Sequence, residues 1–204
     1  MNKKMSFGAE IVQMLLPHRR PFLMVDRILD FKSGKKPSLR AQRHLSINEP
    51  VFAGHFPGLA LYPGAMTLEG LAQSAHLLMT LHHLQNHFSE SSAFTGELMD
   101  ALHNIEMGYR FHPGYDAQQA KDFLAAFEEA SMLRFAVVGA VKAKFLKPVF
   151  AGEVLEYSVH LQRELDHLIH FETEAEVNGT LVAKASLSAS QIHSEMPAYW
   201  RKDL

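Results

Sequence analysis

The chain of 204 residues contains no cysteine. This absence excludes disulfide bonds, a thiol nucleophile and thiolate metal sites, and it fits a reducing cytoplasm. The chain also lacks any run of about 18 apolar residues, so we expect no membrane-spanning helix. We expect no signal peptide, because Glu10 and Gln13 interrupt the apolar stretch that would have to follow Lys3 and Lys4. We therefore expect a cytoplasmic protein.

The chain carries no large excess of charge of either sign. Its 20 lysine and arginine residues face 22 aspartate and glutamate residues, which gives a net charge of −2. Nucleic-acid-binding proteins usually present a strongly basic face, so we expect no nucleic-acid partner. A hydrophobic share of 47% and a charged share of 21% are ordinary for a globular protein. Length and composition favour a single domain over residues 1–204.

Residues 50–89 contain only one residue of the Lys, Arg, Asp and Glu types, and that residue is Glu69. Such a stretch is typical of a core or of the lining of a cavity. A carboxylate buried there needs hydrogen bonds, an opposite charge or a raised pKa. Glu69 is therefore either a half-exposed helix residue, the usual state of a glutamate, or a functional acid.

Hydrophobic periodicity and β-favouring composition predict the secondary structure. The expected elements are a short helix over 9–16, strands over 22–31 and 39–47, a buried helix over 65–87, and strands over 133–147, 153–165, 167–178 and 180–190. Asn178-Gly179 separates the last two strands and is a strong signal for a two-residue hairpin. We interpret residues 88–130 as an acidic, partly helical insertion, with a helix over about 116–130. The order predicts an α+β fold in which a curved antiparallel sheet wraps around one long apolar helix.

His55 and Glu69 are the residues best suited to acid–base chemistry. A neutral imidazole is a natural base near pH 7, and a carboxyl group in an apolar pocket can stay protonated and act as an acid. An elimination needs both, because one group removes a proton and the other donates one. Gly64 lies where the buried helix should begin, so its backbone N–H could stabilise an oxyanion. Gln73 lies one turn after Glu69 and could hydrogen-bond its carboxyl group.

Several motifs along the chain occur in a specific order and spacing. They are Leu-Pro-His-Arg-Arg-Pro-Phe-Leu-Met-Val-Asp-Arg at 16–27, Ile-Asn-Glu-Pro at 47–50, Gly-His-Phe-Pro-Gly at 54–58, Pro-Gly at 63–64, Glu-Gly-Leu-Ala-Gln at 69–73, Lys-Ala-Lys-Phe at 142–145, Lys-Pro-Val at 147–149 and Gly152. Together they resemble the FabZ-like bacterial 3-hydroxyacyl-acyl-carrier-protein dehydratases, which have the hotdog fold. The resemblance covers most of the chain outside residues 88–130, which exceed the usual length of the family.

The resemblance implies a reaction and an assembly. Such enzymes form homodimers that pair their sheets edge to edge, and often hexamers of three dimers. His55 of one chain would face Glu69 of the other across a shared acyl tunnel. His55 would take the α-proton of a 3-hydroxyacyl thioester, Glu69 would protonate the leaving hydroxyl group, and the Gly64 N–H would polarise the thioester carbonyl. The substrate would arrive on the phosphopantetheine arm of acyl-carrier protein, with no metal or organic cofactor, in fatty-acid or related polyketide-like synthesis.

Two other functions stay open beside this one. A hotdog subunit without activity could bind acyl-carrier protein, although the presence of both His55 and Glu69 argues against it. A hotdog thioesterase would instead release a free acid and a thiol. Glu at position 69 resembles the dehydratase-only branch of the family, since the dehydratase-isomerase branch has Asp there. The insertion leaves the preferred acyl chain and the hexamer open.

Further residues of the expected tunnel have two interpretations. Phe56 and Tyr62 would support the tunnel, with Tyr62 either a gate or a packed aromatic side chain. His18 is either a loop histidine with satisfied hydrogen bonds or a contributor to the tunnel or dimer. Histidines 76, 83 and 87 share one helical face, but no carboxylate completes a ligand set, so we expect no metal site.

Five basic residues are candidates for a surface that contacts a partner protein. Either these residues contact an acidic carrier protein or they form the solvated face of a strand. They are Arg19, Arg20, Lys142, Lys144 and Lys147.

Overall fold

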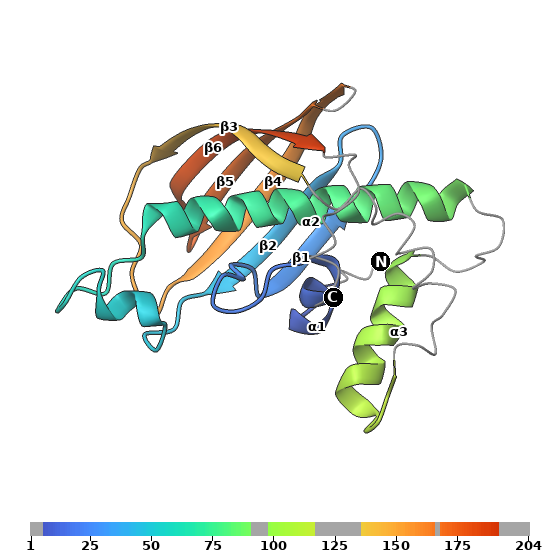
Figure 1. Ribbon diagram of the computed structural model, residues 1–204, viewed down its shortest axis with the longest axis horizontal. Coiled ribbons are helices and arrows are strands. Elements are labelled where there is room, and N and C mark those ends of the chain that lie inside the picture. The colour runs from blue at the N-terminus through green and yellow to red at the C-terminus, as the bar shows by residue number, and fades with distance from the viewer. Residues whose placement is uncertain (1–5, 91–97, 117–135, 166–167, 192–204) are drawn as a thin grey trace, which may run out of the picture.

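The computed structural model describes residues 6–90, 98–116, 136–165 and 168–191. The helices are α1 (Ala9–Leu15), the 3-10 helix η1 (Pro50–Ala53), α2 (Gly64–Glu90) and α3 (Leu98–Phe111). The strands are β1 (Arg27–Lys32), β2 (Ser38–His44), β3 (Ala136–Phe145), β4 (Val154–Leu165), β5 (Leu168–Val177) and β6 (Thr180–Gln191). Figure 1 shows α2 running across the whole width of the sheet. Within the described ranges, no helix is long and apolar enough to cross a lipid bilayer.

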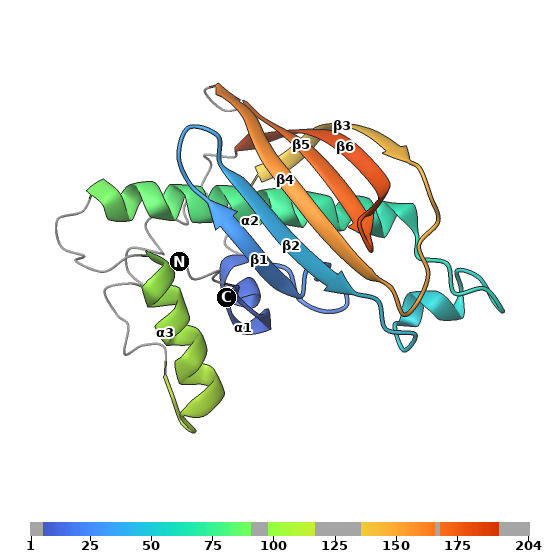
Figure 2. The ribbon, with the colours of Figure 1, turned by 180° about the vertical axis from the view of Figure 1, so that it is seen from behind.

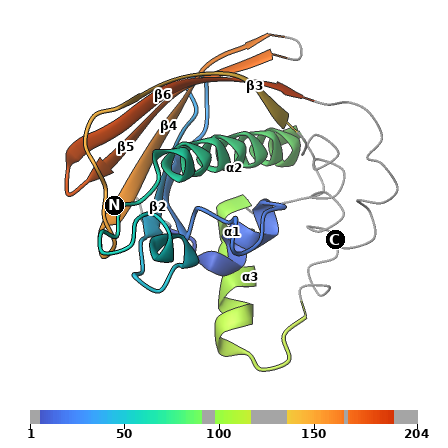
Figure 3. The same ribbon diagram turned by 60° about the vertical axis from the view of Figure 1, so that its left-hand side comes forward.

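The six strands form one antiparallel sheet in the order β1-β2-β4-β5-β6-β3. Figure 2 shows the strands crossing in front of α2, and Figure 3 shows the sheet curving over that helix. Helix α2 contacts every strand except β1 closely, while α1 and α3 lie on its other side. The predicted α+β architecture, a curved antiparallel sheet around one long helix in the hotdog arrangement, is confirmed.

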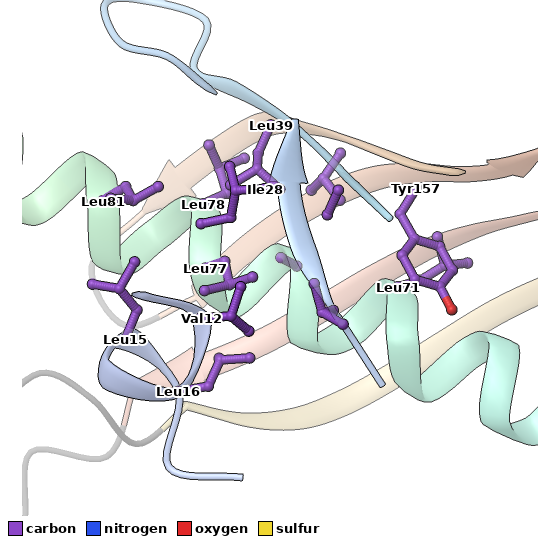
Figure 4. Close-up of a cluster of buried hydrophobic side chains, with 14 of the residues drawn as sticks. Val12, Leu15, Leu16, Ile28, Leu39, Leu71, Leu77, Leu78, Leu81 and Tyr157 are labelled. Atoms are coloured by element: carbon purple, nitrogen blue, oxygen red, sulfur yellow. The ribbon is translucent and has the colours of Figure 1, made fainter. Parts of the chain in front are cut away.

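The core explains why α2 takes the central position. Its apolar side chains point in most directions, so the helix can be stable only where other elements cover it on several sides. Leucines 71, 77, 78 and 81 of α2 are almost completely buried and meet side chains of α1, β1, β2 and β4 (Figure 4). Each buried leucine contributes about 1.5–3 kcal/mol of transfer free energy. The long helix is therefore held by tertiary packing.

The hairpin between β5 and β6 has the predicted turn. Val177 pairs with Thr180, and the two residues between them have positive φ angles of 50° at Asn178 and 73° at Gly179. Positive φ at both central positions is what a two-residue hairpin with the twist of the flanking strands requires. The turn sets the register of β5 and β6 and hence which side chains face α2.

The first strand is shorter than predicted, because residues 22–26 do not belong to it. Strand β1 begins at Arg27, and the backbone before it bonds to other groups: the Phe22 amide closes a turn on the Arg19 carbonyl, and the Met24 amide donates to the Gln73 side chain. The composition of 22–26 resembles a strand, but the amides of Phe22 and Met24 are used by a turn and by α2. The second strand ends at His44 instead of 47.

Helix α3 lies at a position where the sequence analysis did not predict a helix. It falls within residues 88–130, which we interpreted as an acidic, partly helical insertion with its helix further along, and it buries Leu98, Leu102 and Ile105. Its Glu106 is buried, accepts a 2.6 Å hydrogen bond from the Gly8 amide and pairs with Arg110. The helix expected over about 116–130 lies, apart from residue 116, outside the described residues.

Strand β3 forms one edge of the sheet and is exposed along most of its length. It pairs with β6, and no described strand lies on its other side. Large apolar side chains stand on it and just after it, among them Val138, Val141, Phe145 and Leu146, each more than 40% exposed. An exposed apolar edge strand is a template for pairing with another chain.

Candidate active site

The loop before α2 fixes both the position and the tautomer of His55. The His55 amide donates to the Val51 carbonyl of η1 (2.9 Å), which folds the loop back onto that helix. The ring Nδ1 lies 2.8 Å from the Leu61 carbonyl oxygen. A carbonyl oxygen can only accept, so Nδ1 carries the proton, and Nε2 keeps its lone pair. In the neutral ring, Nε2 is therefore the nitrogen that could accept a proton, and the ring is stacked on that of Phe56 at 4.2 Å between centroids.

His55 opens onto a pocket of about 390 Å³ with largely apolar walls. Gly64 and Ala65 of the first turn of α2 line one wall, and the first turn of a helix leaves its N–H groups without internal partners. The other walls come from Phe145 and from the segment that follows β3. An N–H group at a helix start in an apolar pocket is suited to stabilising negative charge on an oxygen.

Backbone hydrogen bonds join the pocket walls to each other. The Tyr62 amide donates to the Val149 carbonyl (2.8 Å), and the Leu146 amide donates to the Val182 carbonyl of β6 (2.7 Å). Lys147 therefore lies on a segment tied to both the His55 loop and the sheet, and it lines the pocket. Tyr62 is buried and donates to the Met24 sulfur (3.3 Å), so in this structure it is a packed aromatic residue. Burial raises the pKa of Tyr62 to about 12.

Glu69 is held by the amide of Gln73, as expected from their spacing. Gln73 Nε2 donates to Glu69 Oε1 (2.8 Å) and to the Phe22 carbonyl (2.7 Å), while Gln73 Oε1 accepts from the Met24 amide (2.8 Å). The Met24 amide is a donor only, so the orientation of the Gln73 amide is unambiguous. Glu69 Oε1 is thereby an acceptor, and any proton on the carboxyl group is left to Oε2.

His18 lies beside this carboxyl group. Its Nε2 is 3.9 Å from Glu69 Oε1, and its ring is half-buried near Phe22. Burial lowers the pKa of His18, the Glu69 carboxylate opposes that shift, and Arg19 adds to it. The lowered pKa favours a neutral imidazole next to Glu69 at pH 7.

Within one chain, His55 and Glu69 do not line the same pocket. His55, Tyr62, Gly64 and Lys147 meet in one pocket, and Glu69 is not among the residues that line it. Glu69 and Gln73 lie instead against the loop that carries Arg19 and Arg20, whose side chains are exposed. One chain therefore presents these two groups of residues at separate places.

The remaining basic candidates lie elsewhere. Phe145 faces Gly64 of α2, and side chains alternate along a strand, so Lys142 and Lys144 point to the opposite face of the sheet. There they line a groove together with Glu172 and Glu174.

The histidine stripe of α2 does not form a metal centre in the described part of the chain. No group of three or more His, Asp or Glu side chains within the described ranges is placed to hold a metal ion. His83 lies instead 3.6 Å from Glu164 of β4.

Sequence reasoning missed a buried ionic cluster that contacts the segments leading to His55 and to Glu69. Arg43 of β2 is 5% exposed, and it pairs with Asp26 (3.0 Å) and Glu49 (2.9 Å). Asp26 and Glu49 occur in the motif blocks at 16–27 and 47–50, which is the signal that could have drawn attention to them. The alternation of β2 was a further signal, because it places Arg43 on the same face as the buried Leu39 and Ala41 and places Arg40 on the opposite, exposed face.

Comparison with known protein families gives a match over much of the chain. Residues 16–107 match the FabA-like domain model. The chain is 33% identical to a 3-hydroxyacyl-[acyl-carrier-protein] dehydratase FabZ of a Nitratiruptor species, over 87% of this chain and 93% of that protein. It is 30% identical to the enzyme of the same name from Pseudoalteromonas translucida, over 93% of this chain and 97% of that protein.

Solved structures with the same fold extend the comparison. The dehydratase heterocomplex ApeI:P from Xenorhabdus doucetiae contains a chain that superimposes with a TM-score of 0.53 at 14% identity, covering 89% of this chain and 90% of that one. At this identity the likeness concerns the fold alone, which is the hotdog fold.

Proposed function

Because the chain belongs to the family of FabZ-like 3-hydroxyacyl-acyl-carrier-protein dehydratases, we propose that His55 and Glu69 are the base and the acid with which it dehydrates its substrate. The substrate is a 3-hydroxyacyl thioester on acyl-carrier protein, the product is a trans-2-enoyl thioester, and the reaction belongs to fatty-acid synthesis. The observation that carries the assignment is the hydrogen bond from His55 Nδ1 to the Leu61 carbonyl, which leaves Nε2 as the proton acceptor of a ring that lines an apolar pocket at the start of α2.

The first half of the reaction is removal of the proton from C2 of the acyl chain. His55 Nε2 accepts this proton, while its Nδ1–H stays on the Leu61 carbonyl and stabilises the imidazolium that forms. Negative charge moves toward the thioester oxygen. The Gly64 N–H at the start of α2 donates to that oxygen, and the apolar walls strengthen the interaction by excluding water.

The second half is loss of the hydroxyl group from C3. Glu69 donates the proton on Oε2 to the leaving oxygen, which departs as water, and the electrons of the broken C2–H bond become the C2=C3 double bond. Gln73 stays bonded to Oε1 throughout, because its N–H can donate to a neutral or an ionised carboxyl group. The products balance without a metal or organic cofactor, since the phosphopantetheine arm only carries the acyl chain.

The complete site forms between two protomers of a homodimer. Pairing of the exposed β3 edge with a second copy buries Val141, Phe145 and their apolar neighbours, and extends the two sheets into one. It also joins the pocket of His55 to Glu69 of the partner subunit. Glu69 and Gln73 lie outside the His55 pocket of their own chain, which is the reason to look for the acid in the partner. Further assembly into a hexamer is compatible with this dimer.

Basic side chains at the mouth of the shared site receive acyl-carrier protein. Lys147 lines the His55 pocket, and Arg19 and Arg20 lie on the loop that packs on Gln73, so a shared site brings both groups together. Lys142 and Lys144 face the other side of the sheet and are the weaker candidates. We expect the enzyme to act in the cytoplasm, where the carrier protein is available to it.

Mass spectrometry of a panel of 3-hydroxyacyl carriers tests the proposal. We expect loss of one water molecule with the wild-type chain, and loss of that activity in His55→Ala and Glu69→Gln. Release of free acid and thiol with no enoyl product would instead identify a thioesterase. Unchanged turnover in either variant would remove the assignment of this site.

Mixed dimers test the shared site directly. A dimer with His55→Ala in one chain and Glu69→Gln in the other keeps one intact pair, His55 of the second chain with Glu69 of the first. Purified through two different affinity tags, such dimers should show about half of the wild-type turnover. Both parent variants alone should be inactive. If the base and acid met within one chain, the mixed dimer would be as inactive as its parents.

A further inference from the structure

Arg43 is buried and bonded to two segments of the chain, one that leads to His55 and one that leads to Glu69. It lies on the inner side of β2, 5% exposed, and uses both terminal nitrogens. Nη1 donates to the Leu23 carbonyl (3.1 Å) and to Asp26 Oδ1 (3.0 Å), while Nη2 reaches Glu49 Oε2 (2.9 Å). Burial opposes the charge of Arg43, but Asp26 and Glu49 outweigh burial and raise its pKa. Two carboxylates and one carbonyl are thus fixed by one planar group.

One arm of this cluster leads to His55. Glu49 is the residue immediately before η1, and the Phe52 amide closes the first turn of that helix on the Glu49 carbonyl (3.1 Å). The Val51 carbonyl of the same helix then receives the amide of His55 (2.9 Å). Fixing the Glu49 side chain therefore fixes the start of the short helix that holds the base.

The other arm leads to Glu69. Leu23, whose carbonyl Arg43 binds, is followed by Met24, whose amide donates to Gln73 Oε1 (2.8 Å). Gln73 in turn donates to Glu69 Oε1 (2.8 Å). Asp26, the second partner of Arg43 in this segment, accepts from the His44 amide (2.7 Å) and so holds the loop against β2.

We propose that Arg43 is a positioning residue that sets both the base and the acid of its chain, and so acts in both active sites of the dimer. This inference rests on the proposed function, because the base and the acid of one chain serve different sites. The guanidinium is suited to the role, since its fork binds a carbonyl and two carboxylates in fixed directions, while a lysine ammonium is a flexible point charge. A displacement of about 1 Å at reacting groups can reduce a rate about 100-fold.

Amide hydrogen exchange tests the structural part without substrate. In Arg43→Lys, we expect faster exchange at the amides of Met24 and His55 than in the wild type. The matched control is Arg40→Lys, the same change on the same strand, where Arg40 is exposed and pairs only with Glu156 (2.5 Å). The control should leave both amides unchanged. Unchanged exchange at Met24 and His55 in Arg43→Lys would overturn the proposal.

Turnover in mixed dimers tests the catalytic part. We start from the dimer that combines His55→Ala with Glu69→Gln and add Arg43→Lys to one chain at a time. Either placement should reduce kcat about 10- to 100-fold with KM changed by no more than about threefold, because both arms pass through Arg43. Loss in only one placement would overturn the claim that Arg43 serves both groups.

Glu49→Gln tests the His55 arm separately from the Glu69 arm. It also keeps the proposal testable if Arg43→Lys fails to fold. It keeps an acceptor oxygen for Arg43 but removes the charge, and it should reduce kcat more in the chain that supplies His55 than in the chain that supplies Glu69. Equal losses in both chains would contradict the assignment of Glu49 to the His55 arm. If amide exchange responds as expected but wild-type protein dehydrates no substrate, the proposed function fails while the coupling through Arg43 stands.

Discussion

Gln73 holds Glu69 from one turn further along α2, with 2.8 Å between Gln73 Nε2 and Glu69 Oε1. Every polar atom of this buried amide is used, because Phe22 and Met24 take its second hydrogen and its oxygen. The amide therefore cannot turn over to accept a proton from Glu69. The amide ties α2 to the loop before β1, and under the proposed mechanism it would leave Oε2 as the carboxyl oxygen that donates the proton.

The first prediction concerns Gln73→Leu. The change removes the hold on Glu69 and leaves the Met24 amide and the Phe22 carbonyl without their partner, so we expect a loss of about 1–3 kcal/mol in the free energy of unfolding. We expect kcat to fall about 10- to 100-fold, because Glu69 loses its orientation. Urea unfolding and steady-state kinetics measure the two effects. Gln13→Leu on α1 is the control, since that side chain bonds only to the exposed Ala9 carbonyl (3.3 Å). Equal kinetics for both variants would contradict the prediction.

The second prediction concerns Gly64→Ala. A Cβ atom at Gly64 would lie 2.9 Å from Cε1 of Phe145, closer than side chains tolerate. Phe145 is 54% exposed in the single chain but buried in the proposed dimer, so we expect a lower Tm of the dimer together with a fall in kcat/KM of about tenfold as the ring is pushed into the pocket. Addition of Phe145→Ala should recover part of the loss. If the double variant is no better than Gly64→Ala, steric crowding is not the cause.

Much of this arrangement follows from local sequence, and the rest from contacts between distant segments. The Asn178-Gly179 turn and the apolar length of α2 were predictable, because turn geometry and hydrophobic periodicity are local properties. The extent of β1 was not, because the Met24 amide is taken by Gln73, 49 residues away. Helix α3 was missed for a similar reason, since its docking depends on Glu106 bonding the Gly8 amide. His55 and Glu69 were found through motif spacing, and the family resemblance also implied that they serve a site shared by two chains; the structure adds that Glu69 is not among the residues that line the pocket of His55. Their catalytic roles, and a single domain over residues 1–204, stay predictions.

The third prediction concerns Gly70, which packs directly against the buried ring of Tyr157. A Cβ atom at Gly70 would be 2.5 Å from Tyr157 Cζ, and the ring has no room to move because it is fully buried in the core (Figure 4). We expect Gly70→Ala to cost at least about 1–3 kcal/mol, measured by urea unfolding. Gly139→Ala on β3 is the control, where the nearest atom to an added Cβ is 3.9 Å away. Equal losses at both positions would show that glycine flexibility, not the Tyr157 contact, sets the cost.

The fourth prediction concerns acid stability and His82. Burial lowers the pKa of His82, the neighbouring His83 adds to the shift, and Glu164 opposes it. An unfolded chain takes up the proton near the ordinary value of 6.5, while the folded chain resists it. His82 therefore destabilises the fold progressively as the pH falls through 6.5 toward the lowered pKa, and has no such effect well above 6.5. We expect His82→Gln to lose less stability than the wild type between about pH 7.5 and 5.5, measured by urea unfolding across pH. An identical pH dependence of the two proteins would contradict this, with exposed His44→Gln as the control for removing an imidazole.

The fifth prediction separates the basic residue proposed to contact acyl-carrier protein, Lys147, from a basic residue on the other face of the sheet. Lys147 lines the His55 pocket, whereas Lys144 lies on the other face of the sheet beside Glu172 and Glu174. A carrier protein with an acidic surface should therefore bind less well to Lys147→Glu, with KM for the carrier-bound substrate raised about 10-fold or more and a weaker dependence on salt. The same substitution at Lys144 places the same charge on the opposite face of the sheet, and should change that KM by less than about threefold. Because both variants alter the net charge equally, a long-range effect of charge alone predicts equal changes. A larger effect at Lys144 than at Lys147 would place the carrier on the outer face of the sheet and remove the docking site proposed at the pocket mouth.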